Sequence, residues 1–204
     1  MRCIRLKCPF IISAKAAKNH ERVIEVAGRL FRERGFDGVG IDAVMAEAGL
    51  THGGFYKSFA SKDELIAEAC RRTADRSTED WAGHARPRRP LANLVTRYLS
   101  SAHRDAPADG CLFAALAADA GRRERPVRAV FADGLKAVAA QIMRLMPGRA
   151  EARRREAALA AMATMIGAMA MARAVDDDAF ANEILAAARS AIIGKDVGTG
   201  GLDA

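Results

Sequence analysis

Cysteines and aromatic residues are scarce in this chain. Aromatic side chains make up 5% of its 204 residues, and only four cysteines are present. So few cysteines do not form a disulfide framework in a chain of this length, and none stands at zinc-ligand spacing beside a matching Cys or His pair. We therefore expect reduced cytosolic thiols and no metal site. The cysteines are Cys3, Cys8, Cys70 and Cys111.

The chain also lacks the motifs of the common enzyme classes. It has no P-loop, no nucleophile elbow and no glycine-rich dinucleotide fingerprint. A di-iron centre in a helical bundle needs Glu-x-x-His pairs, and none occurs. We expect no enzymatic activity and no cofactor.

No uncharged stretch reaches the roughly 20 apolar residues that a membrane-spanning helix needs. Ala157–Ala172 carries no charge, but it is shorter and rich in weakly hydrophobic alanine, which predicts a helix buried on several sides. The apolar stretch Cys8–Ile12 is too short for a secretory signal. We expect a cytoplasmic protein without a membrane partner, whose residues 1–16 form a flexible basic arm.

Alanine and positive charge are what the chain has in excess. Alanine is common and β-branched residues are few, so the predicted fold class is all-α. The net charge is +7 and the pI is about 9.6. Residues 1–62 hold eleven Lys and Arg against six Asp and Glu, so most of the positive excess lies in the first third of the chain. Such a balance suits nucleic acid or an anionic membrane surface.

The first third reads as three helices in succession. Apolar residues recur at helical spacing over 23–31, and Gly35 suits the position after the end of that helix. A short amphipathic helix follows Gly40 as its N-cap and ends at Gly49, and another begins after Thr51. Two short helices around a glycine, held by a preceding helix, form a helix-turn-helix.

The rest of the chain reads as a larger helical body. Ser61 and Glu64 predict a capping box at the start of a long helix with an inward stripe over 65–73. Further apolar stripes follow, the last running from Phe180 to Ile192 and ending at Gly194. The predicted division is a helix-turn-helix head at 17–64, a body at 65–194 and a disordered tail at 195–204.

The head resembles the TetR family of transcriptional regulators. The matching segments keep a fixed spacing and are Ala27–Phe31, Gly35–Phe36, Ala46–Tyr56 and Phe59–Leu65. The resemblance implies a homodimer that binds double-stranded operator DNA, commonly as a repressor. The second helix of the motif would enter the major groove. Two alternatives are a protein of the membrane surface and a ligand-binding body whose head has lost affinity for DNA.

By this resemblance, eight residues of the head are expected at the DNA. Those matching positions that touch or approach phosphate are Thr51, Gly53, Tyr56 and Lys62. Those able to face base edges are His52, Gly54 and Lys57. Gly54 replaces a more common hydroxyl residue, so one typical contact is missing, and Gly40 replaces a frequent Ser or Thr cap.

The resemblance also implies a body that binds a small molecule and dimerises through its last two helices. The residues expected in the dimer interface are Ala163, Gly167, Ala170, Ala188 and Ile192. The candidate pocket residues are Trp81, Tyr98, Cys111, Phe113, Phe131, Met143, Met162 and Met165. Methionines suit adaptable apolar sites, so we expect a modest apolar effector.

Cys111 supports an alternative kind of signal. It follows Gly110 at an expected helix start, where the pKa of a thiol falls and thiolate becomes more available. Asp109 beside it acts in the opposite direction. The alternative function is therefore a regulator that responds to oxidants or electrophiles through Cys111.

Overall fold

A computed structural model describes residues 14–82, 89–146 and 150–197, with side chains described for 14–77, 89–146 and 150–194. Within these ranges the chain forms α-helices, one short 3-10 helix and no strand, so the predicted all-α class is confirmed. The helices of the first half are α1 (Ala14–Arg34), α2 (Ile41–Glu47), α3 (His52–Phe55), α4 (Lys62–Ala82), α5 (Pro90–Tyr98) and α6 (Ser101–Arg104). The remainder are η1 (Pro107–Asp109), α7 (Leu112–Gly121), α8 (Arg125–Arg144), α9 (Glu151–Ala174) and α10 (Asp178–Val197).

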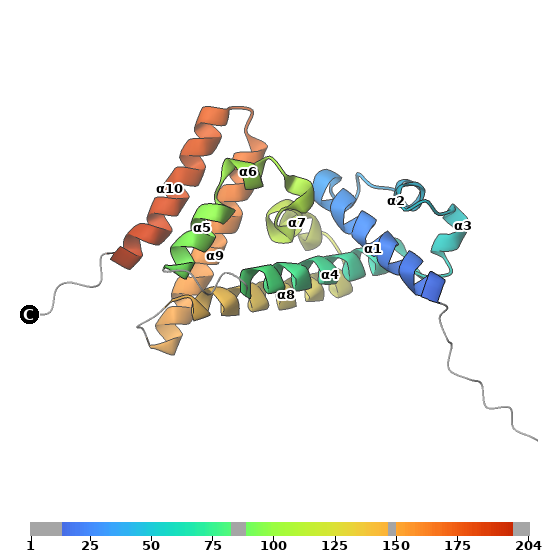
Figure 1. Cartoon of the computed structure of the whole chain (residues 1–204), viewed down its shortest axis with the longest axis horizontal. Coiled ribbons are helices and arrows are strands. Elements are labelled where there is room, and N and C mark those ends of the chain that lie inside the picture. Colours follow the sequence, from blue (N-terminus) through green and yellow to red (C-terminus); the bar gives the residue numbers. More distant parts are fainter. Residues whose placement is uncertain (1–13, 83–88, 147–149, 198–204) are drawn as a thin grey trace, which may run out of the picture.

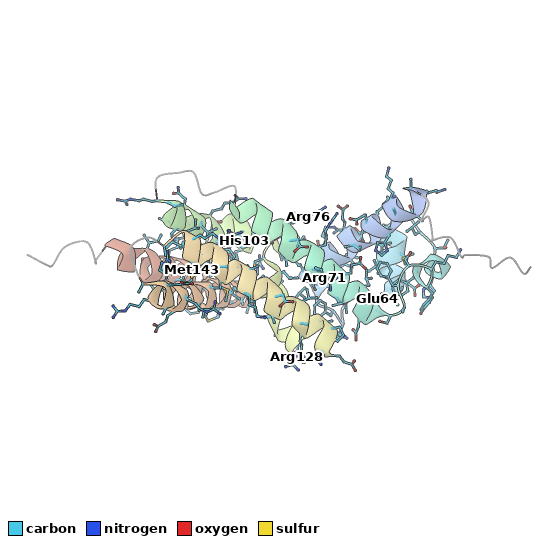
Figure 2. All side chains as sticks on the ribbon, turned by 90° about the horizontal axis from the view of Figure 1, so that it is seen from below. Glu64, Arg71, Arg76, His103, Arg128 and Met143 are labelled. Carbon is cyan, nitrogen blue, oxygen red and sulfur yellow. The ribbon has the colours of Figure 1, made fainter. Side chains whose placement is uncertain are left out.

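The helices are arranged in an elongated molecule (Figure 1). The three helices α1–α3 lie at one end, and α9 and α10 lie at the other with α5 against them. Helix α4 leaves the head and packs along α8, as the turned view in Figure 2 also shows. Helix α7 lies between the two ends and contacts α1, α8 and α9.

Glycines and a capping box set the ends of the head helices. Gly35 and Gly49 have φ values of +73° and +69°, the left-handed region that glycine enters without steric cost, and they end α1 and separate α2 from α3. The Ser61 Oγ accepts from the Glu64 N–H at 3.1 Å. The Glu64 carboxylate accepts in return from the N–H of Ala60, one residue before the usual partner.

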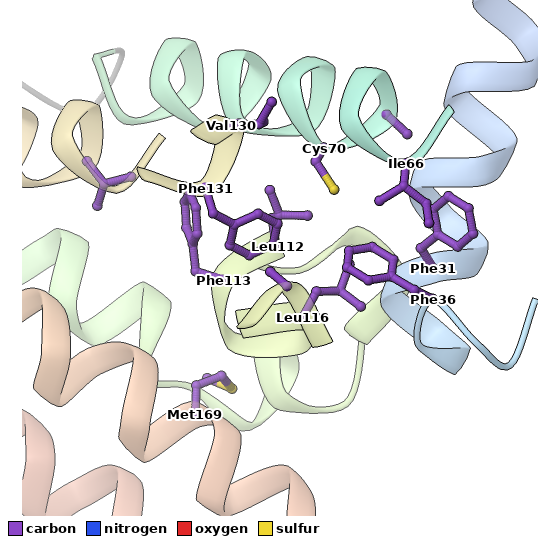
Figure 3. Packing of buried hydrophobic residues seen from close by; sticks show 14 of the residues in the cluster. Phe31, Phe36, Ile66, Cys70, Leu112, Phe113, Leu116, Val130, Phe131 and Met169 are labelled. Atoms are coloured by element: carbon purple, nitrogen blue, oxygen red, sulfur yellow. The ribbon is translucent and has the colours of Figure 1, made fainter. Parts of the chain in front are cut away.

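One hydrophobic cluster runs from the head into the body (Figure 3). Phe31 packs edge-on against Phe36 at 5.5 Å between ring centroids. Leu116 of α7 and Cys70 of α4 lie beside this pair in the same buried cluster. The head therefore has no core separate from that of the body, and the boundary predicted at residue 64 stays a prediction.

Three predictions about helix bounds and faces are wrong. The predicted arm reached residue 16, whereas α1 begins at Ala14. The last helix passes Gly194 and ends at Val197, because one glycine weakens a helix by only about 1 kcal/mol. Phe180 is 50% exposed, because the buried stripe of α10 starts one residue later, at Ala181. The predictions for residues 1–13 and 198–204 lie outside the described residues.

Among the described residues, α9 is long and apolar enough to cross a membrane by length and composition alone. It packs against α8 and α10, and 39% of its most apolar window is buried in the chain. Met171 on its outer side is 55% exposed. Within the subunit, α9 is therefore buried on its inner face and exposed on its outer face, and not buried on several sides as expected.

Candidate functional site

The recognition helix α3 is held by two aromatic rings. Phe55 and Phe59 are buried and stacked, with their ring centroids 5.4 Å apart. Their inward direction leaves the opposite side of the motif to solvent, where the Tyr56 side chain is 63% exposed. The other exposed residues predicted at the DNA are Gly40, Thr51, His52, Gly53 and Lys57, while Gly54 and Lys62 are half-buried.

Two glycines of this surface have room for a side chain. A Cβ at Gly40 or Gly53 would meet nothing within 4 Å, and neither has a positive φ. At Gly54 a Cβ would make an ordinary contact at 3.5 Å with the Met45 methyl group. Packing within the chain therefore does not require glycine at these positions, which is what a surface closely approached by an external partner would show.

His52 and Thr51 show how the first turn of α3 is built. Nδ1 of His52 is hydrogen-bonded to Oδ1 of Asp42, in the first turn of α2. The rings of His52 and Tyr56 meet edge to face at 5.7 Å. Thr51 occupies the predicted N-cap position, but its side chain makes no capping hydrogen bond. The Thr51 hydroxyl is thus not used to cap the start of α3.

His20 connects the head to α4, a role that the periodicity of the sequence did not predict. Its ring stacks on Phe59 at 4.7 Å, and its Nε2 lies 2.9 Å from the Glu68 carboxylate in α4. A single polar residue on α1 thereby links the back of the recognition unit to α4. Only its pairing with a residue distant in sequence reveals this role.

The body contains a partly open cavity of about 340 Å³. Its walls come from α4, α5, α6, the η1–α7 segment, α8 and α9. The apolar part of the wall is formed by Leu94, Phe113, Val138, Met162, Met165 and Ile166. A volume of this size lies at the lower end of the range for small-molecule sites.

Five of the predicted pocket residues line this cavity, and two do not. The five are Tyr98, Cys111, Phe113, Met162 and Met165. Phe131 is buried behind Phe113, with their rings edge to face at 5.5 Å. Met143 follows Val138 by five residues on α8, so it points to another side of that helix. Trp81 belongs to α4, but its side chain lies outside the described residues.

His103 organises the polar side of the cavity (labelled in Figure 2). Its Nδ1 lies 2.6 Å from the Tyr98 carbonyl oxygen, and its Nε2 accepts from the Cys111 N–H at 3.1 Å. Both ring nitrogens are therefore used in a neutral imidazole that donates from Nδ1. Burial lowers the pKa of His103, more than the hydrogen bond to Tyr98 raises it. The ring thus stays neutral and fixes the turn before α7.

The thiols differ in their surroundings. Cys111 is the N-cap residue of α7, half-buried and in the cavity wall. Its side chain contacts the Tyr98 hydroxyl, whose pKa is raised well above its usual value mainly by burial and then by Cys111. Burial raises the pKa of the Cys70 thiol to about 12. Of these two thiols, only Cys111 is placed to react.

Arg32 connects the head to the cavity wall. Its guanidinium, on α1, donates to the Ala108 carbonyl through Nε at 2.6 Å and also through Nη2. Nη1 donates to the Thr73 hydroxyl of α4 at 3.0 Å. Asp109, the next residue after Ala108, already lines the cavity. Burial lowers the pKa of Arg32, and Asp109 opposes that effect.

A second connection joins the turn after α1 to α7. The Asp119 carboxylate accepts from the Phe36 N–H at 3.1 Å. Arg123 pairs with Asp37 and lies over the Phe36 ring at 5.6 Å. The segment from η1 to α7 is therefore joined to the head by two sets of contacts, one through Arg32 and one through Asp119 and Arg123. Neither set produces a periodic pattern in the sequence.

The residues predicted in the dimer interface fall into two groups. Ala163 is exposed, Gly167 and Ala170 are half-buried, and a Cβ at Gly167 would meet nothing within 4 Å. Ala188 and Ile192 are only 8% exposed, because α10 uses this stripe to pack within the subunit. These two therefore have little surface left for a partner.

Comparisons with known proteins agree on the head. The family described as "Bacterial regulatory proteins, tetR family" matches residues 23–69. The "Uncharacterized HTH-type transcriptional regulator YerO" of Bacillus subtilis (strain 168) is 40% identical over 50 residues. That match covers 24% of this chain and 17% of the relative, so the chain matches well under two thirds of its length.

Comparisons with solved structures extend the likeness to the whole fold. A TetR transcriptional regulator from Chloroflexus aurantiacus J-10-fl gives a TM-score of 0.72 at 22% identity, over 90% of this chain and 96% of that one. The reduced form of E. coli NemR gives 0.71 at 17% identity, over 87% and 96%. In the described ranges no group of three or more His, Cys, Asp or Glu could hold a metal ion. The matched segment places the helix-turn-helix head in the tetR family of bacterial regulatory proteins, and the whole chain shares the all-helical fold of solved TetR regulators.

Proposed function

We propose that this protein is a dimeric repressor that leaves a palindromic operator when a small, mainly apolar molecule enters the cavity of its body. The observation that carries this proposal is the position of Arg32, which joins α1 of the head to Ala108, the residue beside the cavity wall. As in its family, we expect it to act in the cytoplasm, without a membrane partner.

The DNA-facing surface supports operator binding by the head. Tyr56, Lys57 and Thr51 stand exposed around α3, and the positive excess of the first third favours phosphate. In this proposal Thr51, Gly53, Tyr56 and Lys62 contact or approach the backbone, while His52, Gly54 and Lys57 face the bases. Gly40 brings the start of α2 close to the duplex. Backbone contacts would position the head and base contacts would select the sequence.

The outer face of α9 supports dimerisation. Ala163, Gly167 and Met171 follow one another at spacings of four residues and are exposed or half-buried. Large apolar surfaces on a soluble protein commonly mark an interface. A two-fold axis through this face would pair two heads for two operator half-sites.

The chemistry of the cavity favours an apolar effector. The Ser100 hydroxyl donates to the Arg97 carbonyl and accepts from the His103 N–H. The Ser77 hydroxyl donates to the Thr73 carbonyl, and both ring nitrogens of His103 are engaged. These donors serve the protein itself, so apart from the charged residues Arg97 and Asp109 the wall offers a ligand mainly Phe113 and the aliphatic and methionine side chains.

Release requires that the effector bind the free conformation better than the DNA-bound one. A ligand pressing on Asp109–Cys111 would displace Ala108 and loosen its bonds to Arg32. Because Arg32 also donates to the Thr73 hydroxyl, the same displacement would change that contact and tilt α4. Changed head spacing would then lower the affinity for an operator whose half-site spacing is fixed by the duplex.

The test is selection of duplexes from a random pool, followed by a screen of small apolar molecules against the selected site. We expect a palindrome with half-sites about one helical turn, or a multiple of it, apart. Lys62→Ala should weaken operator and non-operator binding alike and reduce the salt dependence by about one counterion. Selection of no duplex would remove the regulatory function, and selection without any releasing molecule would remove the effector.

The matched control for the screen is Met165→Trp. Met165 is 1% exposed and lines the cavity, so the larger ring should fill the cavity and abolish release. Operator binding should persist. A folded Met165→Trp protein that still releases DNA would place the effector elsewhere.

The position of Cys111 favours a second candidate function, a response to electrophiles. Its thiol lies in the cavity wall beside Tyr98, and one fold relative was solved in a reduced form. N-ethylmaleimide would form a thioether with Sγ, and the thiol proton would pass to the adjacent ring carbon. In a Cys3→Ser, Cys8→Ser background, labelling should release the operator, and Cys111→Ser should abolish that release. An unchanged response in Cys111→Ser would reject this candidate.

A further inference from the structure

Asp42 lies at the predicted DNA surface, where a carboxylate is unexpected. It stands in the first turn of α2, and its side chain is 84% exposed. A negative charge beside phosphates lowers the affinity for every duplex. Its hydrogen bond to His52 joins two exposed side chains, and such surface pairs contribute little to stability. As the acidic residue in the first turn of α2, Asp42 stabilises that helix modestly through the helix dipole, but non-specific DNA affinity does not account for a carboxylate at this surface.

The contact between Asp42 and His52 fixes a side chain at the start of the recognition helix. Oδ1 of Asp42 lies within hydrogen-bond distance of Nδ1 of His52, and the Tyr56 ring meets the imidazole from another side. Within the described residues, Nε2 of His52 makes no hydrogen bond. The ring is thus held at Nδ1, while Nε2 has no partner among the described residues and is left for an external one.

We propose that Asp42 determines operator specificity by acting through His52. Its carboxylate accepts the Nδ1 proton, which sets the tautomer and the orientation of the ring and leaves Nε2 for a base edge. In the neutral ring that nitrogen is an acceptor, and its partners in the major groove are the amino groups of adenine and cytosine. The inference rests on the proposed operator readout by His52.

Asp42 thereby lowers affinity for all sequences and raises the difference between them. Specificity is a difference of affinities, and because the repulsion is the same for every duplex, the gain in specificity comes from the His52 contact that Asp42 orients. At an operator the contact of His52 offsets the repulsion between Asp42 and phosphate. At other sequences the repulsion stays and the contact is absent.

The test compares Asp42→Asn with Asp42→Leu. Both variants remove the charge at similar size, but only asparagine keeps an oxygen that accepts from Nδ1. Binding is measured for the full-length protein with the selected operator, its single-base variants and a non-operator duplex. We expect both variants to bind non-operator DNA severalfold more tightly. Asp42→Asn should keep the base preferences, and Asp42→Leu should lose about tenfold in discrimination at the positions weakened by His52→Ala.

The matched control is Glu47→Gln, which removes a charge from the same helix without touching His52. It should leave all base preferences intact. In a His52→Ala background, Asp42→Leu should cause no further loss of discrimination. Full discrimination in Asp42→Leu, or equal loss in the Asn and Leu variants, would overturn the proposal. If His52→Ala selects the parental site, the proposal fails while the regulatory function stands, and if the parent selects no duplex, both fail.

Discussion

The guanidinium of Arg32 donates two hydrogen bonds to the carbonyl oxygen of Ala108, 76 residues further along the chain. The first partner belongs to the helix that supports the DNA-binding motif, and the second adjoins the wall of the body cavity. Under the proposed function, a shift of Ala108 would therefore act directly on α1. This relationship gives a test of coupling that needs no effector.

Gly110→Ala should act as a built-in effector. A Cβ there would lie 2.5 Å from Nη2 of Arg173 and 3.1 Å from both the Ala106 carbonyl and Nε2 of His103, so the Arg173 guanidinium must move and the turn must give by a few tenths of an ångström. We expect operator affinity to fall about tenfold, within the usual range of coupling between sites. In an Arg32→Met background the same change should have little effect, because the link is already cut. Operator titration of the four proteins checks this, and additive losses would show that Arg32 does not couple the sites.

Gly53→Ala should separate DNA binding from folding. The added methyl group meets no atom of the chain, and alanine is a better helix former by about 1 kcal/mol, so stability should rise slightly. Operator affinity should fall about tenfold if the α3 backbone approaches the duplex closely. Gly121→Ala, at an equally open glycine on α7, is the control and should leave DNA binding unchanged. Normal operator binding by Gly53→Ala would move the backbone away from the DNA.

Gly167→Leu should disrupt the dimer without unfolding the subunit. The position is open within the chain, so a leucine clashes only with a partner packed on α9. Sedimentation should show monomers, and operator affinity should fall because the two heads are no longer joined. Gly121→Leu is the control. A dimeric Gly167→Leu protein would locate the interface elsewhere.

His103 should make stability fall in mild acid. Burial lowers the pKa of His103 in the folded state, so below about pH 6.5 the unfolded chain binds this proton more readily than the folded one. Stability from this group is therefore complete above that pH and is lost as the pH falls through the folded pKa. His103→Gln should remove this part of the pH dependence. The free energy of unfolding is measured in urea at pH 8 and at pH 5.5 for both proteins. An equal loss of this free energy between the two pH values in the parent and in His103→Gln would reject the prediction.

Local chemistry made much of the fold predictable. Gly35, Gly49 and the pair Ser61–Glu64 each act within a few residues of themselves, so the ends of the head helices could be read directly. The bond from Arg32 to Ala108 could not, because a single polar side chain paired across the chain leaves no periodic pattern.

The candidate sites were predictable to different degrees for the same reason. Apolar stripes identify which side of a helix is buried, but not what covers it. Ile192 was therefore assigned to a dimer interface although it packs within its own subunit. Phe131 and Phe113 both lie on the apolar side of a helix, so the sequence does not distinguish them. In the structure Phe113 lines the cavity and Phe131 packs edge to face behind it.

Under the proposed function, the two sides of the cavity would have separate roles. The wall of Val138, Met162, Met165 and Ile166 belongs to α8 and α9 and makes no hydrogen bond to the head among the described residues, whereas the wall of Asp109–Cys111 adjoins the Arg32 contact. Mutations on the first wall would then change which molecule fits, while the second wall would still transmit the entry of a molecule to the head. Over evolutionary time such a regulator can acquire new inducers without rebuilding its output, and a sensor engineer can randomise the α8–α9 wall while leaving Arg32 and Ala108 untouched.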